Sequence, residues 1–192
     1  MLRALALGAL VFAVSSGCLP KVPRQRLSEP TKIAVGLVVD PGYAGVPFAP
    51  PDSLWQALVT ELADHNLQPV PVPLESLAGQ RLTDARFEVM KKAPDAQYLL
   101  LVEQRVQFFS QIDGRYRWEV GTALAASRVD GPVAKDTFEI PVVLMFDHQK
   151  EKEAIATCAS DVSNRAGVLL DGVIASANAA AAPAPAPAPA PK

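Results

Sequence analysis

Residues 96–146 read AQYLLLVEQRVQFFSQIDGRYRWEVGTALAASRVDGPVAKDTFEIPVVLMF, and this stretch decides the fold. Apolar and polar residues alternate along it with a period of two, which is typical of strands with one buried face. Two Asp-Gly pairs, at 113–114 and 130–131, interrupt the alternation, and Asp-Gly is a common hairpin turn. The stretch therefore predicts a three-stranded antiparallel meander.

The register of this meander follows from its apolar faces. Even-numbered residues are mainly apolar in the first two strands, so the two faces coincide only if even-numbered residues pair, as in Phe108 opposite Trp118. A two-residue turn of Asp113 and Gly114 would pair odd with even. We therefore expect a three-residue loop, 112–114, with Gly114 in the left-handed conformation.

The second turn follows the same rule, because a loop of residues 129–131 places Thr122 opposite Phe138. The other face of the first two strands is polar and of mixed charge, with Glu103, Arg105, Gln107, Arg115, Arg117 and Glu119. Such a face is usually solvated. Phe109 beside Arg117, at the exposed tip of the hairpin, would instead make a docking edge.

The region before the meander contains a strand, a helix and an edge segment. Residues 32–39 are almost continuously apolar, as expected for a strand that is buried on both faces. A loop rich in Pro and Gly, 40–51, follows, and then a helix that Asp52 or Ser53 can cap. Residues 67–72 alternate with proline, which only an edge strand or an extended connection tolerates.

Two more helices complete the prediction. Residues 74–92 are expected to be helical, with Phe87 and Met90 as the best support in the second half. Residues 147–177 are expected to form the longest helix, in which Gly167 marks close packing on the sheet or a bend. Its apolar stripe comprises Ile155, Ala159, Val162, Ala166, Leu169 and Val173.

The fold class is therefore α/β (α+β). We expect a mixed sheet with a C-terminal antiparallel three-stranded meander, two N-terminal helices and a long C-terminal helix packed on it.

Residues 1–17 have the layout of a secretory signal peptide. Arg3 precedes an apolar stretch, 4–14, and small residues then lead to Cys18. An apolar stretch of about eleven residues is well short of the roughly 20 that a membrane-spanning helix needs. We therefore expect this segment to be removed on export.

The junction at Cys18 resembles the lipobox of bacterial lipoproteins, in which the thiol receives a diacylglycerol and the new amino terminus is acylated, commonly with palmitate. Ser15 stands where that family prefers Leu or Val. The alternative is an ordinary secreted protein, cut between Ala13 and Gly17, with Cys18 as a free thiol. Leu19 follows the cysteine, and by the sorting rule of enteric bacteria the resemblance implies the periplasmic face of the outer membrane.

Composition divides and limits the rest of the chain. Residues 18–30 are expected to be a lipid-anchored tether, 31–177 the α/β domain, and 178–192 a disordered Ala/Pro spacer or, alternatively, a docking peptide. The chain has 18 basic and 20 acidic residues and no basic run. Nucleic-acid binding therefore has no electrostatic support.

Residues with catalytic or metal-binding chemistry are few. His65, His148 and Cys158 share no spacing that indicates a site. We expect surface roles at helix ends for both histidines and a buried, packing role for Cys158. The sequence contains no nucleophile elbow, zinc-protease motif or phosphate loop. We therefore expect no enzyme, no cofactor and no metal site.

Two surfaces are the candidates for binding a partner. One is the loop after the first strand, where Tyr43, Val46 and Phe48 would supply apolar anchors. The other is the hairpin tip with Phe109, Arg115 and Arg117. For the loop, the alternative is that its apolar residues only cover the core.

The order of the elements resembles a known domain of the bacterial envelope. The segments NLQPV at 66–70 and PDAQYLLLV at 94–102 carry this resemblance. The domain occurs in the N-terminal part of TolB, in the curli-secretion lipoprotein and in the lipoprotein activators of penicillin-binding proteins. Over residues 31–177, the resemblance implies a non-enzymatic interaction module that faces the periplasm.

Three functions are therefore compared. The first is a membrane-anchored adaptor that binds an envelope protein in envelope assembly or maintenance. The second is a lipoprotein subunit of lipid or lipopolysaccharide transport. The third is a lipoprotein that binds a small ligand.

Overall fold

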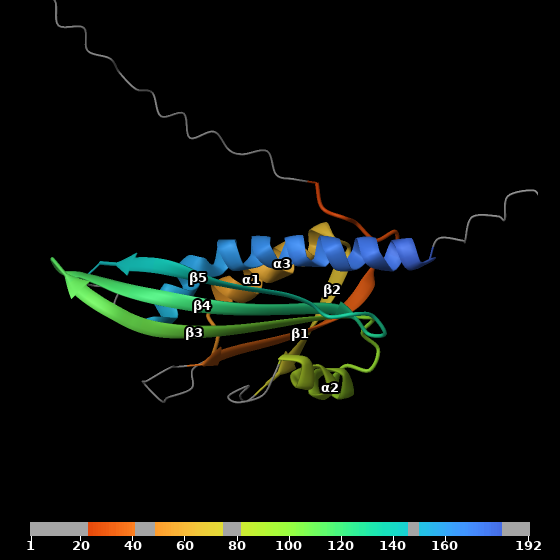
Figure 1. The fold of residues 1–192 in the computed structure, drawn as a ribbon, viewed down its shortest axis with the longest axis horizontal. Coiled ribbons are helices and arrows are strands. Elements are labelled where there is room, and N and C mark those ends of the chain that lie inside the picture. Colours follow the sequence, from red (N-terminus) through yellow and green to blue (C-terminus); the bar gives the residue numbers. More distant parts are fainter. Residues whose placement is uncertain (1–22, 41–48, 75–81, 146–149, 182–192) are drawn as a thin grey trace, which may run out of the picture.

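The computed structural model describes residues 23–40, 49–74, 82–145 and 150–181. In chain order, the described elements are β1 (Thr31–Asp40), α1 (Asp52–Asp64), β2 (Leu67–Pro73), α2 (Leu82–Lys92), β3 (Tyr98–Ile112), β4 (Arg115–Arg128), β5 (Ala134–Leu144) and α3 (Glu151–Ala181). The strands form one mixed sheet in the order β2-β1-β3-β4-β5. Helices α1 and α3 cover one face of the sheet and α2 covers the other (Figure 1). The predicted fold class is confirmed.

β1 is the central buried strand that its composition predicts. It pairs in parallel with β2 on one side and with β3 on the other. Ile33 and Val35 pack towards α1 and α3, whereas Ala34 packs towards α2. Both faces of the strand are therefore buried, which explains why the apolar residues run continuously instead of alternating.

β2 lies at one edge of the sheet, as its prolines require. Pro69, Pro71 and Pro73 pair with alternate residues of β1. Proline has no N–H to give to a neighbouring strand, so it is tolerated only where that N–H would point away from the sheet. The prolines therefore also leave the outer edge of β2 poor in donors, which disfavours the addition of another strand.

The register of the first hairpin is confirmed, but its predicted loop is wrong. Phe108 lies opposite Trp118, as expected. The turn has only two residues, Asp113 and Gly114, with φ of 51° and 71°, as in a type I′ turn. The pairing shifts between Phe108 and Ser110. A bulge at Phe109 therefore supplies the extra residue that we had assigned to the loop.

The register of the second hairpin is also confirmed, because Thr122 lies opposite Phe138. The predicted three-residue loop, 129–131, is wrong: the ladder of the two strands ends at the pair Ala126 and Ala134, and residues 129–133 connect β4 to β5. Beyond it, the side chain of Arg86 in α2 donates hydrogen bonds to the carbonyl oxygens of Arg128, Val129 and Gly131. These bonds attach the turn to α2 and supply partners for carbonyl groups that lie outside the ladder.

Two expectations about the first two helices are wrong. Neither Asp52 nor Ser53 caps α1: the N-cap is Pro51, without a side-chain hydrogen bond, and Asp52 is already in the first turn. There a carboxylate still favours the helix dipole. In α2, Phe87 is 70% exposed, whereas Ala85 and Val89 are buried and Met90 is partly buried against them. A short helix needs only this narrow face to cover one side of β1 and β3.

The C-terminal helix α3 is the longest described helix, as predicted. The predicted stripe lies against the core of α1 and the sheet, with Leu169 only partly buried. Gly167 does mark close packing, but the neighbour is α1 and not the sheet, because a Cβ there would overlap the carboxylate of Glu61. In the described part of the chain, no helix combines the length and apolarity that a membrane span needs.

Candidate docking surface at the β3–β4 hairpin

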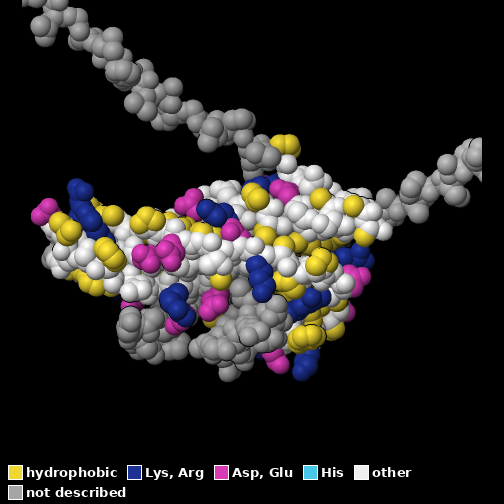
Figure 2. All heavy atoms as spheres, in the orientation of Figure 1, with side chains coloured by type: hydrophobic (Ala, Val, Ile, Leu, Met, Phe, Trp, Pro, Cys, Tyr) yellow, Lys and Arg dark blue, Asp and Glu magenta, His cyan; other side chains and the backbone are white. Residues whose placement is uncertain are grey.

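The β3–β4 hairpin projects at one narrow end of the molecule and exposes large apolar side chains there (Figures 1 and 2). Phe109 is 68% exposed and Met145, just after β5, is 59% exposed. Figure 2 shows hydrophobic and basic side chains together at this end. We call this end the hairpin surface, and it comprises Phe108, Phe109, Ile112, Arg115, Arg117, Val143 and Met145.

Aromatic packing holds one of these side chains in place. The ring of Phe108 meets the ring of Trp118 edge-on, with centroids 5.5 Å apart, and lies 6.0 Å from that of Tyr116. Trp118 is nearly buried, whereas Phe108 is half exposed. A half-exposed ring that already has fixed neighbours loses little conformational entropy when a partner covers it.

The bulge explains why Phe109 is exposed. It lies at the point where the pairing shifts between Phe108 and Ser110, so no residue of β4 is directly opposite. A bulge bends its strand and re-aims the side chains beside it. Phe109 therefore points away from the core at a position where the alternation of the strand is broken.

The two arginines add positive charge to the hairpin surface. Arg117 pairs with Val143 of β5, and Arg115 pairs with Ile112 across the hairpin. Both arginines are exposed, and neither makes an ion pair with another described residue. Each guanidinium can therefore offer its donors to a partner without first losing a carboxylate.

The structure brings together three of the six residues that we predicted to bind a partner. Phe109, Arg115 and Arg117 lie on one hairpin. Tyr43, Val46 and Phe48 lie outside the described residues. Sequence reasoning missed Ile112, Val143 and Met145, and it placed Phe108 in the core. The apolar alternation continues past the end of the core, and alternation alone does not show where α3 stops covering the sheet.

The rest of the polar face of the meander carries paired charges. Arg105 donates to Asp40 of β1 at 3.0 Å. Burial raises the pKa of Glu103, and Arg105 opposes this effect. This face therefore satisfies part of its charge internally, unlike the hairpin surface.

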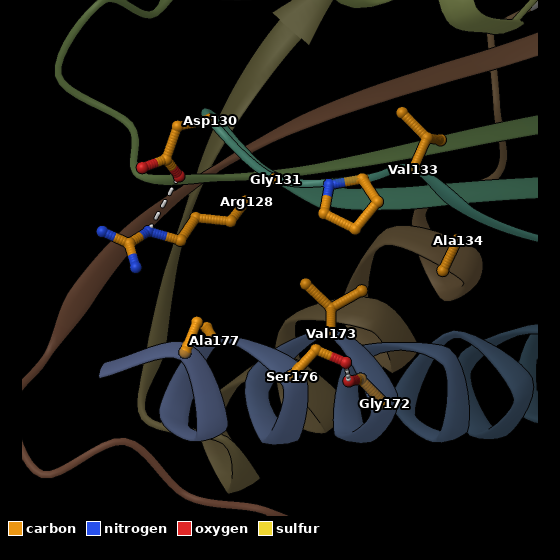
Figure 3. Close-up of a pocket in the computed structure, with 11 residues that line it drawn as sticks. Arg128, Asp130, Gly131, Val133, Ala134, Gly172, Val173, Ser176 and Ala177 are labelled. Atoms are coloured by element: carbon orange, nitrogen blue, oxygen red, sulfur yellow. Dashed lines mark hydrogen bonds and ion pairs between the residues drawn. The ribbon is translucent and has the colours of Figure 1, made fainter. Parts of the chain in front are cut away.

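A groove lies at the other end of the sheet, between α3 and the β4–β5 turn (Figure 3). It encloses about 520 Å³, and Val173 points into it from α3. The ion pair of Arg128 and Asp130, at 3.0 Å, stands at one end. A second hollow of about 500 Å³ shares Ala134 and Gly172 with the first, so the groove continues along α3. Its walls are mainly apolar.

Both described residues with catalytic potential, His65 and Cys158, are buried. His65 is fully buried, so the predicted surface role is wrong: residues 23–30 cover the end of α1, and the carbonyl of Gln25 lies 2.8 Å from His65 Nδ1. Cys158 is buried as predicted. Burial, and secondarily Asp161, raises its pKa to about 11, so its thiol stays protonated near neutral pH. His148 lies outside the described residues.

No cluster of three or more potential metal ligands occurs among the described residues.

No protein-family model matches the sequence, and a search of curated proteins finds no relative. Several solved structures are similar. Protein XCC0632 from Xanthomonas campestris, of family model DUF330, has 15% identity and a TM-score of 0.46, and the match covers 80% of this chain and 91% of that one. The PelC dodecamer from Paraburkholderia phytofirmans has 15% identity, coverage of 74% and 94%, and a TM-score of 0.39.

A minor lipoprotein from Acinetobacter baumannii has 13% identity, coverage of 77% and 93%, and a TM-score of 0.41. At these values the likenesses assign no family to this chain and carry no argument about its function.

Proposed function

We propose that this protein is a lipoprotein of the bacterial envelope, anchored through Cys18, and that it acts as a non-enzymatic interaction module for another envelope protein. The anchor rests on the signal-peptide layout and on the lipobox resemblance at residues 15–18. Leu19 supports the periplasmic face of the outer membrane. A role in envelope assembly or maintenance follows from this location.

The hairpin surface is the observation that carries the interaction role. A side chain as large as Phe gains roughly 1.5–3 kcal/mol when it moves from water into a packed environment. Exposed apolar side chains gather at this end, and two of them, Ile112 and Val143, pair across the strands with Arg115 and Arg117. Neither arginine has an ion-pair partner among the described residues. Aromatic residues and arginine dominate the binding energy of protein interfaces. The surface is therefore suited to a protein partner with an apolar patch and nearby carboxylates.

The state of the reactive side chains supports a non-enzymatic role. The Cys158 thiol is buried and stays protonated at neutral pH. His65 is enclosed by the N-terminal residues and contacts the carbonyl of Gln25. General acid–base or nucleophilic catalysis needs a group that reaches a substrate, and neither group is placed to do so.

A photo-crosslinking experiment tests the partner. A photoreactive phenylalanine replaces Phe109 in the exported full-length protein, and cells are irradiated. The matched control replaces Phe87, which is equally exposed but lies on α2. We expect one envelope protein to be captured from position 109, not from 87, and to be lost when Arg115 and Arg117 are both changed to Ala. Capture of lipid alone from 109 would contradict the adaptor role.

Mass spectrometry of the mature N-terminus tests the anchor separately. The proposed function predicts a diacylglyceryl group on Cys18 and an acylated amino terminus. An unmodified end at another residue would contradict the membrane anchor while leaving the crosslinking result intact.

The groove beside α3 favours a second candidate function, the binding of an apolar small molecule or lipid chain. Pockets for such ligands have volumes of about 300–1,000 Å³ and mainly apolar walls, as this groove does. Gly172 lines the groove, and a Cβ there would meet nothing within 4 Å, so Gly172→Leu would place a larger side chain at the groove wall. A bound fluorescent fatty acid that Gly172→Leu displaces would favour this candidate. Unchanged or absent binding would leave the interaction module as the better account.

A further inference from the structure

Residues 23–30 do not project from the domain but lie against it, and we call them the N-terminal segment. The backbone N–H of Leu27 donates to the carbonyl of His65 at 3.0 Å, and Asn66 returns a hydrogen bond to the carbonyl of Leu27 at 3.1 Å. The N–H of Gln25 donates to Asp171 at 2.6 Å. The segment therefore bonds to the end of α1 and to the middle of α3.

Arg24 forms the centre of this attachment. Its Nε donates to Glu61 Oε1 at 2.5 Å, and its Nη1 lies 3.3 Å from Asp171 Oδ2. Its Nη2 donates to the carbonyl of Asn164 at 3.1 Å. The side chains of Arg24 and Glu61 are only 8% and 6% exposed. A buried charge is tolerated when it is paired and hydrogen-bonded, as it is here.

Gly167 makes room for this attachment. A Cβ at this position would overlap the carboxylate of Glu61 and lie 3.0 Å from Cζ of Arg24. Glycine inside a helix costs about 1 kcal/mol relative to alanine. Glycine is therefore suited to this position of α3, because the Arg24–Glu61 pair fills the space between α1 and α3 that a larger side chain would need.

The short distance from Cys18 to this segment limits where the lipid can be. Five residue steps separate Cys18 from Pro23, and a fully extended chain covers at most about 3.6 Å per residue, or about 18 Å in all. The domain has three layers, α1 with α3, the sheet, and α2 (Figure 1). With about 10 Å per layer, the lipid cannot reach the outer side of α2.

We propose that the N-terminal segment is a strap that holds the lipid anchor on the α1–α3 side, so that this side of the domain faces the membrane. This inference rests on the lipid anchor of the proposed function. In this orientation the sheet runs along the membrane. β3 has 15 residues, or about 50 Å at 3.3 Å per residue, so the hairpin surface lies well to the side of the anchor.

Energy transfer to the bilayer tests the orientation. The full mature lipidated protein is placed in phosphatidylethanolamine–phosphatidylglycerol vesicles that carry acceptor dyes on their headgroups. A donor dye is attached at Thr60→Cys on α1 or at Glu88→Cys on α2, both exposed positions. Cys158 is buried and the thiol of Cys18 carries the diacylglyceryl group, so only the new thiol reacts. We expect higher transfer from position 60 than from position 88.

Variants of the strap provide the controls. The double change Arg24→Ala and Glu61→Gln removes the buried ion pair and leaves only the partly exposed carboxylate of Asp171 without Arg24. We expect it to abolish the difference between the two positions. We also expect the double change to accelerate hydrogen exchange at the backbone amides of Gln25 and Leu27. Arg26→Ala is the matched control, because Arg26 is an exposed arginine of the same segment. We expect Arg26→Ala to keep the difference and the slow exchange.

The outcomes separate this inference from the proposed function. An acylated protein with equal transfer from positions 60 and 88, or a difference that survives the double change, would overturn the strap alone. An unacylated mature N-terminus would overturn both the anchor and the strap. The double variant could also lose the transfer difference while its Gln25 and Leu27 amides still exchange slowly. That result would show that the strap is not the cause of the orientation.

Discussion

The end of the sheet that carries the N-terminal segment and the end that carries the hairpin surface depart from the usual distribution of side chains in opposite ways. At the first end, charged groups are buried: Arg24, Glu61 and part of Asp171. At the second, large apolar groups such as Phe109 and Met145 are exposed. At the first end, the buried charges pair with one another within the chain. At the second end, the apolar side chains stay in contact with water.

This difference assigns different tasks to the two ends. Buried charges that pair with each other have no need of an external ligand, so the N-terminal segment is an internal attachment. Exposed apolar groups gain free energy only when something else covers them. The hairpin surface therefore calls for a partner, whereas the attachment fixes how the domain is held.

The largest effect on stability is expected from Arg24→Ala. It leaves the carboxylate of Glu61 without its cation, and the loss of one partner of a buried pair costs about 3–5 kcal/mol. Water can reach Glu61 once the segment leaves, so we expect about 3 kcal/mol, the lower end of that range. Urea unfolding measures it. A loss as small as that of Arg26→Ala would show that the pair is not buried in solution.

A pH dependence of stability is expected from Cys158, a residue of α3 that is buried in the core. The folded pKa is raised to about 11, whereas an unfolded thiol titrates near 8.5. Above pH 8.5 the unfolded state binds fewer protons than the folded state, so stability falls as pH rises towards 11. At 1.36 kcal/mol per pKa unit, the loss between pH 7 and pH 10.5 amounts to about 2.5 kcal/mol.

The comparison of unfolding at pH 7 and at pH 10.5 measures this dependence, with Cys158→Ala as the control. The variant loses packing at both pH values, but its stability should fall less between them. A fall equal to that of the unchanged protein would assign the dependence to other groups.

Two glycines of α3 give a matched pair with effects of opposite sign. Gly167→Ala forces a Cβ into the Arg24–Glu61 pair, and such overpacking costs about 1–3 kcal/mol. Alanine recovers about 1 kcal/mol of helix propensity, so we expect a net loss of about 1 kcal/mol. Gly172→Ala meets no atom within 4 Å and should gain up to about 1 kcal/mol. Equal changes at both positions would show that the close approach at Gly167 is absent.

The register of the meander could be predicted from the sequence. The apolar faces of neighbouring strands coincide only when even-numbered residues pair with even-numbered ones. Phe108 opposite Trp118 and Thr122 opposite Phe138 both followed from it. The length of the β3–β4 turn could not be predicted in the same way. A three-residue loop and a two-residue turn with a bulge satisfy the same parity, and nothing in the alternation distinguishes them.

The attachment of the N-terminal segment depends on contacts between residues far apart in the chain. His65 looks like a surface residue at a helix end until Gln25, 40 positions earlier, covers it. The one local signal was Gly167, a glycine inside a helix whose cost indicates close packing. The sequence could show that a close neighbour existed but not that it was Glu61 with Arg24 beyond it.

The smallest effect on stability, and the largest on binding, is expected from Phe109→Ser. Phe109 is 68% exposed and has no direct partner on β4, so its removal should change the free energy of unfolding by less than about 0.5 kcal/mol. Loss of an interfacial aromatic side chain costs 2 kcal/mol or more in binding when it is a hot spot, about a 30-fold weaker affinity.

Urea unfolding and the affinity for the crosslinked partner measure the two effects on the same samples. Phe87→Ser on α2 is the control, and it should change neither quantity by much. A large loss of stability with Phe109→Ser would place Phe109 in the core of the hairpin. Unchanged affinity would show that the partner binds another surface. This one substitution therefore decides whether the hairpin surface is the binding surface.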